Sequence, residues 1–363
     1  MLGSKEYPFG SSARHDSRAG GGIELHVEKL SKYLARRGNE VFIITRRFPR
    51  QEPEETVNGV RIIRIRYLPN KYLRAFSLNL LGLIKAILLV RKDDIDVVHC
   101  HSMVAGFFGY ILSRVARKPM VFTPHGMIVG WGFPAREVLR LFQKIALRGA
   151  NRVIFISRPA MNALSKRTKK PHALLSNAID IEDYDFRTEK SSGVRFLFLG
   201  RLEEVKGVDT LIEAFSIVLE KHKKARLMIA GEGSMKNSVV DLILKARSDR
   251  IRYMGWMGAK EALKKSDVFV LPSTEKGQPV ALLEAMAAGK IVITSLPFIK
   301  PGRTGIACRA GDPEGLARKM LEVCRDFRRY RKIGENARES IKGLTWESQA
   351  GLFEKEYKKV LGN

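Results

Sequence analysis

The chain has 363 residues, a length that suits two domains of ordinary size. Hydrophobic residues make up 45% of it, which is enough for packed cores and argues against global disorder. The net charge of +27 is uneven, because residues 1–180 hold 31 Lys and Arg against 13 Asp and Glu. Such a field favours anionic partners such as nucleic acid, acidic lipid or phosphorylated substrates, although a basic surface also serves solubility.

Cysteine usage indicates a reducing compartment. The sequence has an odd number of cysteines and no CxxC pair: Cys100, Cys308 and Cys324. This pattern argues against a disulfide framework or a cysteine zinc site. Residues 1–5 do not resemble a secretory signal. We therefore expect a cytoplasmic protein.

Strand-like and helix-like segments alternate along the chain. The expected strands are short, β-branched or aromatic runs: 41–45, 61–66, 96–101, 120–123, 152–157, 195–200, 226–230, 268–271 and 291–294. Amphipathic helices are expected between several of them: 24–37, 208–221 and 312–325. Buried parallel strands have this composition, and their alternation with helices predicts doubly wound α/β sheets.

The first helix follows Gly20, Gly21 and Gly22. Glycines let the backbone approach a phosphate closely, and free N–H groups at a helix start attract anions. A flexible turn before a helix is the alternative interpretation.

The longest apolar stretch, 76–90, contains Asn79 and Lys85. It is shorter than the roughly 20 residues that a membrane span needs. We expect a helix packed on a sheet, with contact at a membrane surface as the alternative.

Histidines gather at two expected strand ends. His125 follows the strand 120–123, where it could position a sugar hydroxyl, although a lone histidine is more often structural. His99 and His101 alternate on one strand and share a face. Together the three resemble a metal site, but no carboxylate is suitably spaced, so we expect no metal.

The segment 178–193 predicts a domain boundary. It contains the acidic, irregular run 180–185 and the flexible residues 191–193. Two α/β domains with a cleft between them would follow, and such clefts usually hold ligands.

Two cations follow the strand 195–200. Arg201 and Lys206 precede the helix 208–221, where fixed positive charge stabilises a leaving diphosphate. The alternative is a pair of surface cations neutralised by Glu203 and Glu204.

The segment 268–289 carries the most information. It reads as a buried strand, a polar turn and an apolar helix that bears Glu284 and ends at Gly289. In an open α/β sheet, ligands bind where strand ends meet helix starts, so a nucleotide-linked substrate is expected here.

Together these motifs resemble one family, the retaining glycosyltransferases of family 4 with the GT-B fold. The matching elements occur in the family's order over nearly the whole chain: the glycine loop 20–22 before the His26 helix, 36–41, 124–126, 177–180, 200–201 with 206–207, 272–273 and 283–289. The resemblance implies two Rossmann-like, doubly wound domains that face each other across a cleft. Their expected bounds are 1–180 on the acceptor side and 190–345 for the nucleotide-sugar, with a helix at 346–363 that packs back on the first domain.

The resemblance also implies roles for single residues. Arg201 and Lys206 would bind the donor diphosphate, Glu284 the ribose, and His125 would line the sugar site; these cations and His125 form the implied catalytic set. The implied donor-binding residues are Gly21, Gly22, Leu283, Glu284, Glu275, Lys276 and Gly277. No metal or other cofactor is implied, because cations and helix dipoles replace it.

The sequence departs from the family pattern at three places. Lys276 stands where the family has a glutamate that contacts the donor sugar, and Glu275 lies one residue early. The loop after Thr294 is short. Only Met1 and Leu2 precede the polar residues before the glycine loop, so the first strand of the family is expected to be truncated or to lie upstream.

The favoured interpretation is a cytoplasmic retaining glycosyltransferase that uses a UDP- or GDP-sugar. The basic N-terminal half suggests a phosphate-bearing or lipid-linked acceptor. It also suggests that the protein contacts an anionic surface, the inner face of a membrane. A catalytically impaired, glycosyltransferase-like binding protein is the alternative.

Nucleic-acid binding is disfavoured, since basic residues lack interleaved aromatics. An epimerase shares the fold, but Glu284 and the Arg201–Lys206 pair favour transfer. The sequence leaves open the donor base, the sugar, the acceptor and the oligomeric state.

Overall fold

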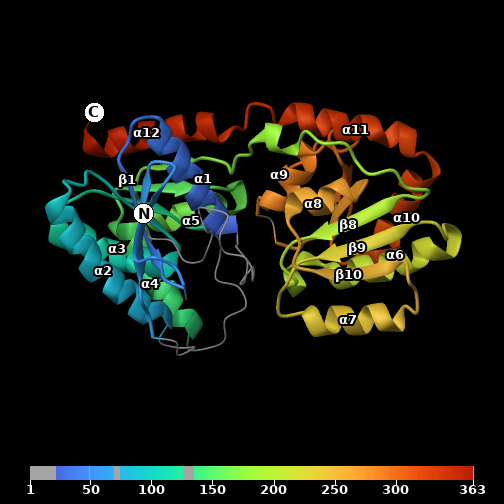
Figure 1. Ribbon diagram of the computed structural model, residues 1–363, viewed down its shortest axis with the longest axis horizontal. Helices are drawn as coiled ribbons and strands as arrows, with labels where there is room; N and C mark the ends of the chain where they lie inside the picture. The colour runs from blue at the N-terminus through green and yellow to red at the C-terminus, as the bar shows by residue number, and fades with distance from the viewer. Residues whose placement is uncertain (1–21, 49, 69–73, 126–134, 276, 363) are drawn as a thin grey trace. The chain divides into compact units, whose positions relative to one another are not determined.

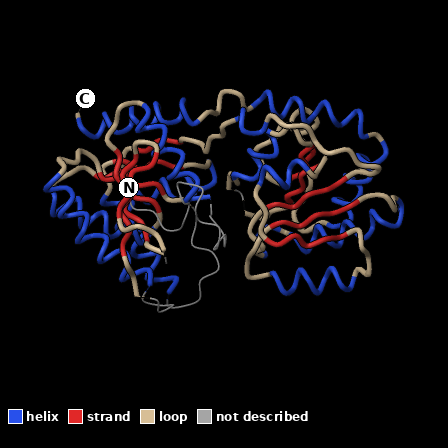
Figure 2. Tube along the Cα trace, in the orientation of Figure 1, coloured by secondary structure: helices blue, strands red, loops and turns tan. Residues whose placement is uncertain are grey.

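The computed structural model describes residues 22–48, 50–68, 74–125, 135–275 and 277–362 (Figure 1). They form two compact units. The first unit takes the described residues up to Asn177 together with residues 346–362, and the second takes residues 178–345. In both units strands lie inside and helices outside (Figure 2).

The first unit holds two sheets among its described residues. One has the order β1-β3-β2, in which β1 and β3 are parallel and β2 is antiparallel: β1 (Val41–Arg46), β2 (Glu54–Val57) and β3 (Val60–Ile65). The other is parallel with the order β4-β5-β6-β7: β4 (Val98–His101), β5 (Met120–Thr123), β6 (Arg152–Phe155) and β7 (His172–Leu174). Both sheets contribute to one hydrophobic core, in which Phe42, Ile63 and Phe122 are buried.

Helices cover the first unit in two groups. The helix α1 (Gly22–Arg36) packs against α12 (Trp346–Leu361), so the end of the chain returns to the unit where it began. Arg37, just after α1, holds this contact by ion pairs with Glu347 and Glu354, each 2.9 Å long. The helix α3 (Met103–Ala116) packs against both α2 (Arg74–Lys92) and α4 (Ala135–Gly149). The helix α5 (Arg158–Thr168) is capped by Ser157, whose hydroxyl accepts a hydrogen bond from the Ala160 N–H.

The second unit is a doubly wound parallel sheet with the order β10-β9-β8-β11-β12-β13. Its strands are β8 (Arg195–Leu199), β9 (Arg226–Ala230), β10 (Ile251–Gly255), β11 (Val268–Leu271), β12 (Ile291–Thr294) and β13 (Ile306–Ala307). Its helices are α6 (Val208–Lys221), α7 (Lys236–Lys245), α8 (Ala259–Lys264), α9 (Val280–Ala287), α10 (Pro313–Arg325) and α11 (Phe327–Ser340). The chain proceeds outward from β8 through β9 to β10 and then returns to the other side of β8 as β11. The point where the strand order reverses therefore lies between β8 and β11, where such sheets bind ligands.

Most of the expected elements are confirmed. The strands β5, β9, β11 and β12 and the helix α6 have the bounds that the sequence predicted, because each is a sharply bounded apolar or amphipathic run. The sequence missed β2, β7, β10 and β13. These strands are short or partly exposed, and their residues lack a continuous apolar run. The apolar stretch 76–90 is a helix that contacts β1 and β3, as expected.

The boundary segment is more ordered than its composition indicated. The chain enters the second unit at Ala178, and Ile181–Tyr184 forms a 3₁₀ turn that packs on α9. Over the described ranges, none of the helices has the length and apolar character of a membrane span.

Candidate functional site

Two loops meet at the reversal point of the second sheet. The strands β8 and β11 are hydrogen-bonded neighbours, and each is followed by a loop that leads to a helix start. Residues 200–207 join β8 to α6, and residues 272–279 join β11 to α9. Because both loops leave the carboxyl ends of adjacent parallel strands, they share one edge of the sheet.

Close backbone contact joins these loops. Gly207 has φ +68°, and a Cβ there would lie 2.5 Å from the Pro272 carbonyl oxygen, so only glycine fits without displacing the backbone. The carbonyl of Val205 accepts from the Thr274 N–H at 2.9 Å and from the Ser273 hydroxyl at 2.8 Å. The sequence identified both loops, and this contact fixes them against each other.

The two expected cations lie on the first of these loops, and each has a carboxylate partner. Lys206 Nζ lies 2.5 Å from Glu275 Oε2 on the second loop. Arg201 pairs with Glu203 at 2.9 Å, and 69% of its side chain is exposed. The alternative of local neutralisation by Glu203 and Glu204 is thus correct for Arg201 and wrong for Lys206, whose partner is 69 residues away. An anionic ligand would have to compete with both carboxylates.

A third loop, 231–235, supports the first and was missed by sequence reasoning. The Leu202 N–H donates to the Glu232 carbonyl at 3.0 Å, and the Ser234 hydroxyl donates to Glu203 Oε2 at 2.8 Å. Gly231 has φ +145°, and a Cβ there would overlap the Gly200 carbonyl oxygen. The available signal was the Gly-Glu-Gly sequence directly after the predicted strand 226–230, a place where glycine often marks close backbone approach.

The helix α9 carries the expected ribose ligand. Glu284 is half-buried, and its Oε1 accepts a hydrogen bond from the Tyr184 hydroxyl at 2.7 Å. Tyr184, at the end of the 3₁₀ turn Ile181–Tyr184, thus holds the carboxylate in place. Leu283 is fully buried in the core, so only its backbone can face a ligand. Gly277 has open space where a side chain would be. Lys276 and Gly21 lie outside the described residues, while Gly22 is the first residue of α1.

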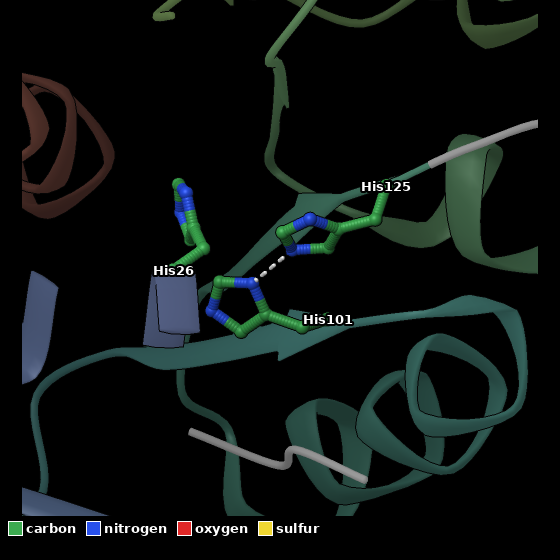
Figure 3. Close-up of side chains that lie close together, drawn as sticks. All are labelled: His26, His101 and His125. Carbon is green, nitrogen blue, oxygen red and sulfur yellow. Dashed lines mark hydrogen bonds between the residues drawn. The ribbon is translucent and has the colours of Figure 1, made fainter. Parts of the chain in front are cut away.

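A second cluster lies in the first unit and is made of imidazoles (Figure 3). His26 comes from α1, His101 ends β4, and His125 follows β5. The rings converge: His101 Nδ1 and His125 Nε2 are 2.7 Å apart and hydrogen-bonded, and the His26 and His125 ring centroids are 4.9 Å apart. His99 adjoins this cluster, because its ring centroid lies 4.2 Å from that of His101. Its own ring nitrogens each lie 2.8 Å from a hydroxyl, one from Tyr357 and one from Thr123.

Burial keeps these rings neutral. It lowers the pKa of His26 to about 4, against the opposing effect of the Asn177 side chain, which lies 3.0 Å from His26 Nδ1. Burial likewise lowers the pKa of His99, His101 and His125 well below 6.5. Neutral imidazoles have one nitrogen that accepts a hydrogen bond, which suits them to orient hydroxyl groups.

The same cluster has the spacing closest to a metal site in the described part of the chain. One nitrogen from each of His26, His101 and His125 lies within 4.8 Å of the others. Sequence reasoning grouped His99 with His101 and His125. In the structure the converging nitrogens are those of His26, His101 and His125, and both nitrogens of His99 are hydrogen-bonded to hydroxyls. The hydrogen bond between His101 and His125 occupies one nitrogen of each ring. The expectation of no metal stays a prediction.

Comparison with known proteins agrees with this geometry. Residues 20–183 match the model of "Glycosyltransferase Family 4", and residues 193–326 match "Glycosyl transferases group 1". The chain belongs to glycosyltransferase family 4. Like other family 4 enzymes it has the GT-B fold, so the predicted fold class is confirmed.

Relatives of this glycosyltransferase extend over nearly its whole length. It is 27% identical to the phosphatidyl-myo-inositol mannosyltransferase of Mycobacterium leprae, over 94% of the chain and 93% of the relative. Sucrose-phosphate synthase from Thermosynechococcus elongatus has the same fold, with a TM-score of 0.83 at 22% identity over 95% of both chains. HepE of Anabaena, solved with UDP-glucose, has a TM-score of 0.74 at 17% identity over 94% of this chain and 98% of its own.

The neutral histidines make stability depend on pH. Since the pKa of His26 is about 4 in the folded state and about 6.5 in the unfolded state, the unfolded chain binds more protons between these values. Stability is therefore complete above about pH 6.5 and is lost as pH falls toward 4. We expect the wild type to lose about 2–3 kcal/mol more unfolding free energy between pH 7 and 4.5 than His26→Gln, which cannot titrate.

Urea unfolding at both pH values measures this difference. His172→Gln is the matched control, because His172 is exposed and should leave the pH dependence of the wild type unchanged. Identical pH dependence in the wild type and His26→Gln would contradict the assignment.

Proposed function

We propose that this glycosyltransferase retains the anomeric configuration, takes its sugar from a UDP- or GDP-sugar and passes it to a hydroxyl of a phosphate-bearing or lipid-linked acceptor. The joined loops at the reversal point of the second sheet carry the proposal, because they bring Lys206 to Glu275 on the loop that leads to α9 and carry Arg201 on the same loop as Lys206. The solved complex of HepE with UDP-glucose and the name of the mannosyltransferase relative support the donor and acceptor classes.

The chemistry follows from the charges. As the bond from the sugar to the diphosphate breaks, negative charge develops on the leaving oxygen, and fixed cations at Arg201 and Lys206 stabilise it. Glu203 and Glu275 hold these cations in the absence of a donor, and a diphosphate replaces them. Glu284 accepts hydrogen bonds from the ribose hydroxyls, Gly22 and Gly277 allow close approach, and His125 orients a sugar hydroxyl.

The setting that we propose is the cytoplasm, with the protein peripheral at the inner face of the membrane. The free cysteines and the excess of basic residues in the N-terminal half support this assignment. Nucleic acid is not among the proposed partners, and the proposed reaction requires no cofactor other than the nucleotide-sugar.

Removing either cation tests the proposed leaving-group site. We expect Arg201→Ala and Lys206→Ala each to lower turnover at least tenfold, which corresponds to about 1.4 kcal/mol of transition-state stabilisation. Arg250→Ala is the matched control, since Arg250 pairs with its neighbour Asp249. It directly precedes β10, so it lies at the amino ends of the parallel strands, whereas the site lies at their carboxyl ends. Nucleotide-sugar turnover that is unchanged in both variants would refute the roles given to them.

Binding of a free nucleoside diphosphate tests the ribose ligand. Calorimetry should show that Glu284→Ala weakens binding by about 1–3 kcal/mol, as the loss of a hydrogen bond to a charged group does. Tyr184→Phe should weaken it by only about 0.5–1.5 kcal/mol, because the carboxylate remains but loses the hydroxyl that orients it. Equal affinities for wild type and Glu284→Ala would remove Glu284 from the site.

One observation favours the second candidate, a glycosyltransferase-like binding protein of low activity. Glu275 could replace the glutamate that is absent at position 276, but its carboxylate is already bound to Lys206. Under this second function the sugar hydroxyls lack an acceptor at this point of the site. We expect Lys276→Glu to increase transfer at least tenfold under this second function and to leave an active wild type within about twofold. Robust transfer by the wild type, measured as release of the nucleoside diphosphate, eliminates the second candidate.

A further inference from the structure

The helix α2 is apolar on two sides. Its inner side packs into the core of the first unit through Leu83, Ala86 and Leu89. Its outer side carries a ridge with a spacing of four residues, formed by Phe76, Leu80, Ile84 and Leu88, with Leu81 beside it. Ile84 is 52% exposed and Leu88 58% exposed. A helix that is hydrophobic all round is usually buried on all sides, so the outer ridge indicates a partner.

Neighbouring helices extend this surface. The helix α3 packs against both α2 and α4, and the three helices form one layer of the first unit (Figure 1). Val138 and Leu141 of α4 and Val115 of α3 are about half exposed. Exposed apolar residues therefore occur on all three helices of this layer.

The charge of this layer is predominantly positive. Together α2, α3 and α4 contain nine Lys and Arg residues and a single acidic residue, Glu137. Glu137 is paired with Arg140, and the acids just beyond α2 are paired as well, Asp93 with Arg61 and Asp94 with Lys118. Lys144 and Arg148 are exposed on α4, and Arg91 and Lys92 are exposed at the end of α2.

From these observations we infer that the layer of α2, α3 and α4 docks on an anionic lipid bilayer, with α2 lying in the plane of the headgroups. Leucine and isoleucine side chains of the ridge enter the boundary of the acyl chains, while the flanking cations bind lipid phosphates. A helix of 19 residues is about 28 Å long, which is enough for the ridge to lie along the surface.

Charge distinguishes this occupant from a second copy of the chain. A symmetric dimer through this layer would bring two surfaces of the same positive sign together, in a protein whose net charge is already +27. Anionic lipid supplies both an apolar phase and the opposite charge. The inference gives the proposed membrane partner a specific surface, and it does not depend on the roles of Arg201, Lys206 or Glu284.

Flotation of the full chain with vesicles tests the inference. Wild type should float with vesicles of phosphatidylcholine and phosphatidylglycerol, and it should float at least tenfold less with phosphatidylcholine alone or in high salt. Ile84→Glu/Leu88→Glu should lower flotation with the anionic vesicles at least tenfold, because charged side chains cannot enter the acyl boundary. The matched control is Leu244→Glu, which makes the same change at a residue of α7 that is 69% exposed in the second unit.

A second pair of variants tests the cations. Lys144→Glu/Arg148→Glu should remove the preference for anionic vesicles, and Arg328→Glu/Arg329→Glu, which reverses two exposed charges of α11, should keep it. Circular dichroism and melting temperature show whether each variant is folded.

Three results would overturn the inference: a wild type that floats with neither vesicle, equal flotation of Ile84→Glu/Leu88→Glu and wild type, or a dimer in sedimentation that this double substitution dissociates. Calorimetry with nucleoside diphosphate on the same variants keeps this test separate from the proposed function. Normal nucleotide binding without flotation refutes the docking surface and the proposed membrane setting and leaves the donor site intact. Flotation without nucleotide binding refutes only the donor site.

Discussion

The candidate donor site depends on the contact between the loops that follow β8 and β11. The left-handed backbone of Gly207 brings the chain against the Pro272 carbonyl, and the Val205 carbonyl accepts hydrogen bonds from Ser273 and Thr274. Without this contact, Arg201 and Lys206 would belong to one surface loop and Glu275 to another. With it, charges that are far apart in sequence face one another at the edge where the sheet reverses its strand order.

The candidate site residues are held differently in the two units. In the second unit, each cation is held by a carboxylate, and Arg201 is largely exposed whereas Lys206 is partly buried. In the first unit, imidazoles are withdrawn from water, and burial lowers each pKa so that the rings stay neutral. Exposed ion pairs rearrange at little cost, whereas a buried hydrogen-bonded cluster is fixed.

The helix α2 shows how one segment can serve folding and recognition together. Its inner residues complete the core beneath β1 and β3, and its outer residues leave an apolar ridge among cations. The sequence posed a choice between a helix packed on a sheet and a helix at a membrane surface. The structure supports the first, and the two are compatible, because a helix has two sides and the sheet covers only one.

By itself the sequence determined the α/β class, the family and most of the strands, because short apolar runs, glycine loops and charged residues at strand ends are local signals. It also identified Arg201, Lys206, His125 and Glu284 as candidates. It could not show that Lys206 pairs with Glu275, that Tyr184 donates a hydrogen bond to Glu284, or that a nitrogen of His26 converges with those of His101 and His125. These facts depend on which loops and rings the fold brings within about 3–5 Å of each other, and side-chain contact at such sequence separation is decided only by tertiary packing.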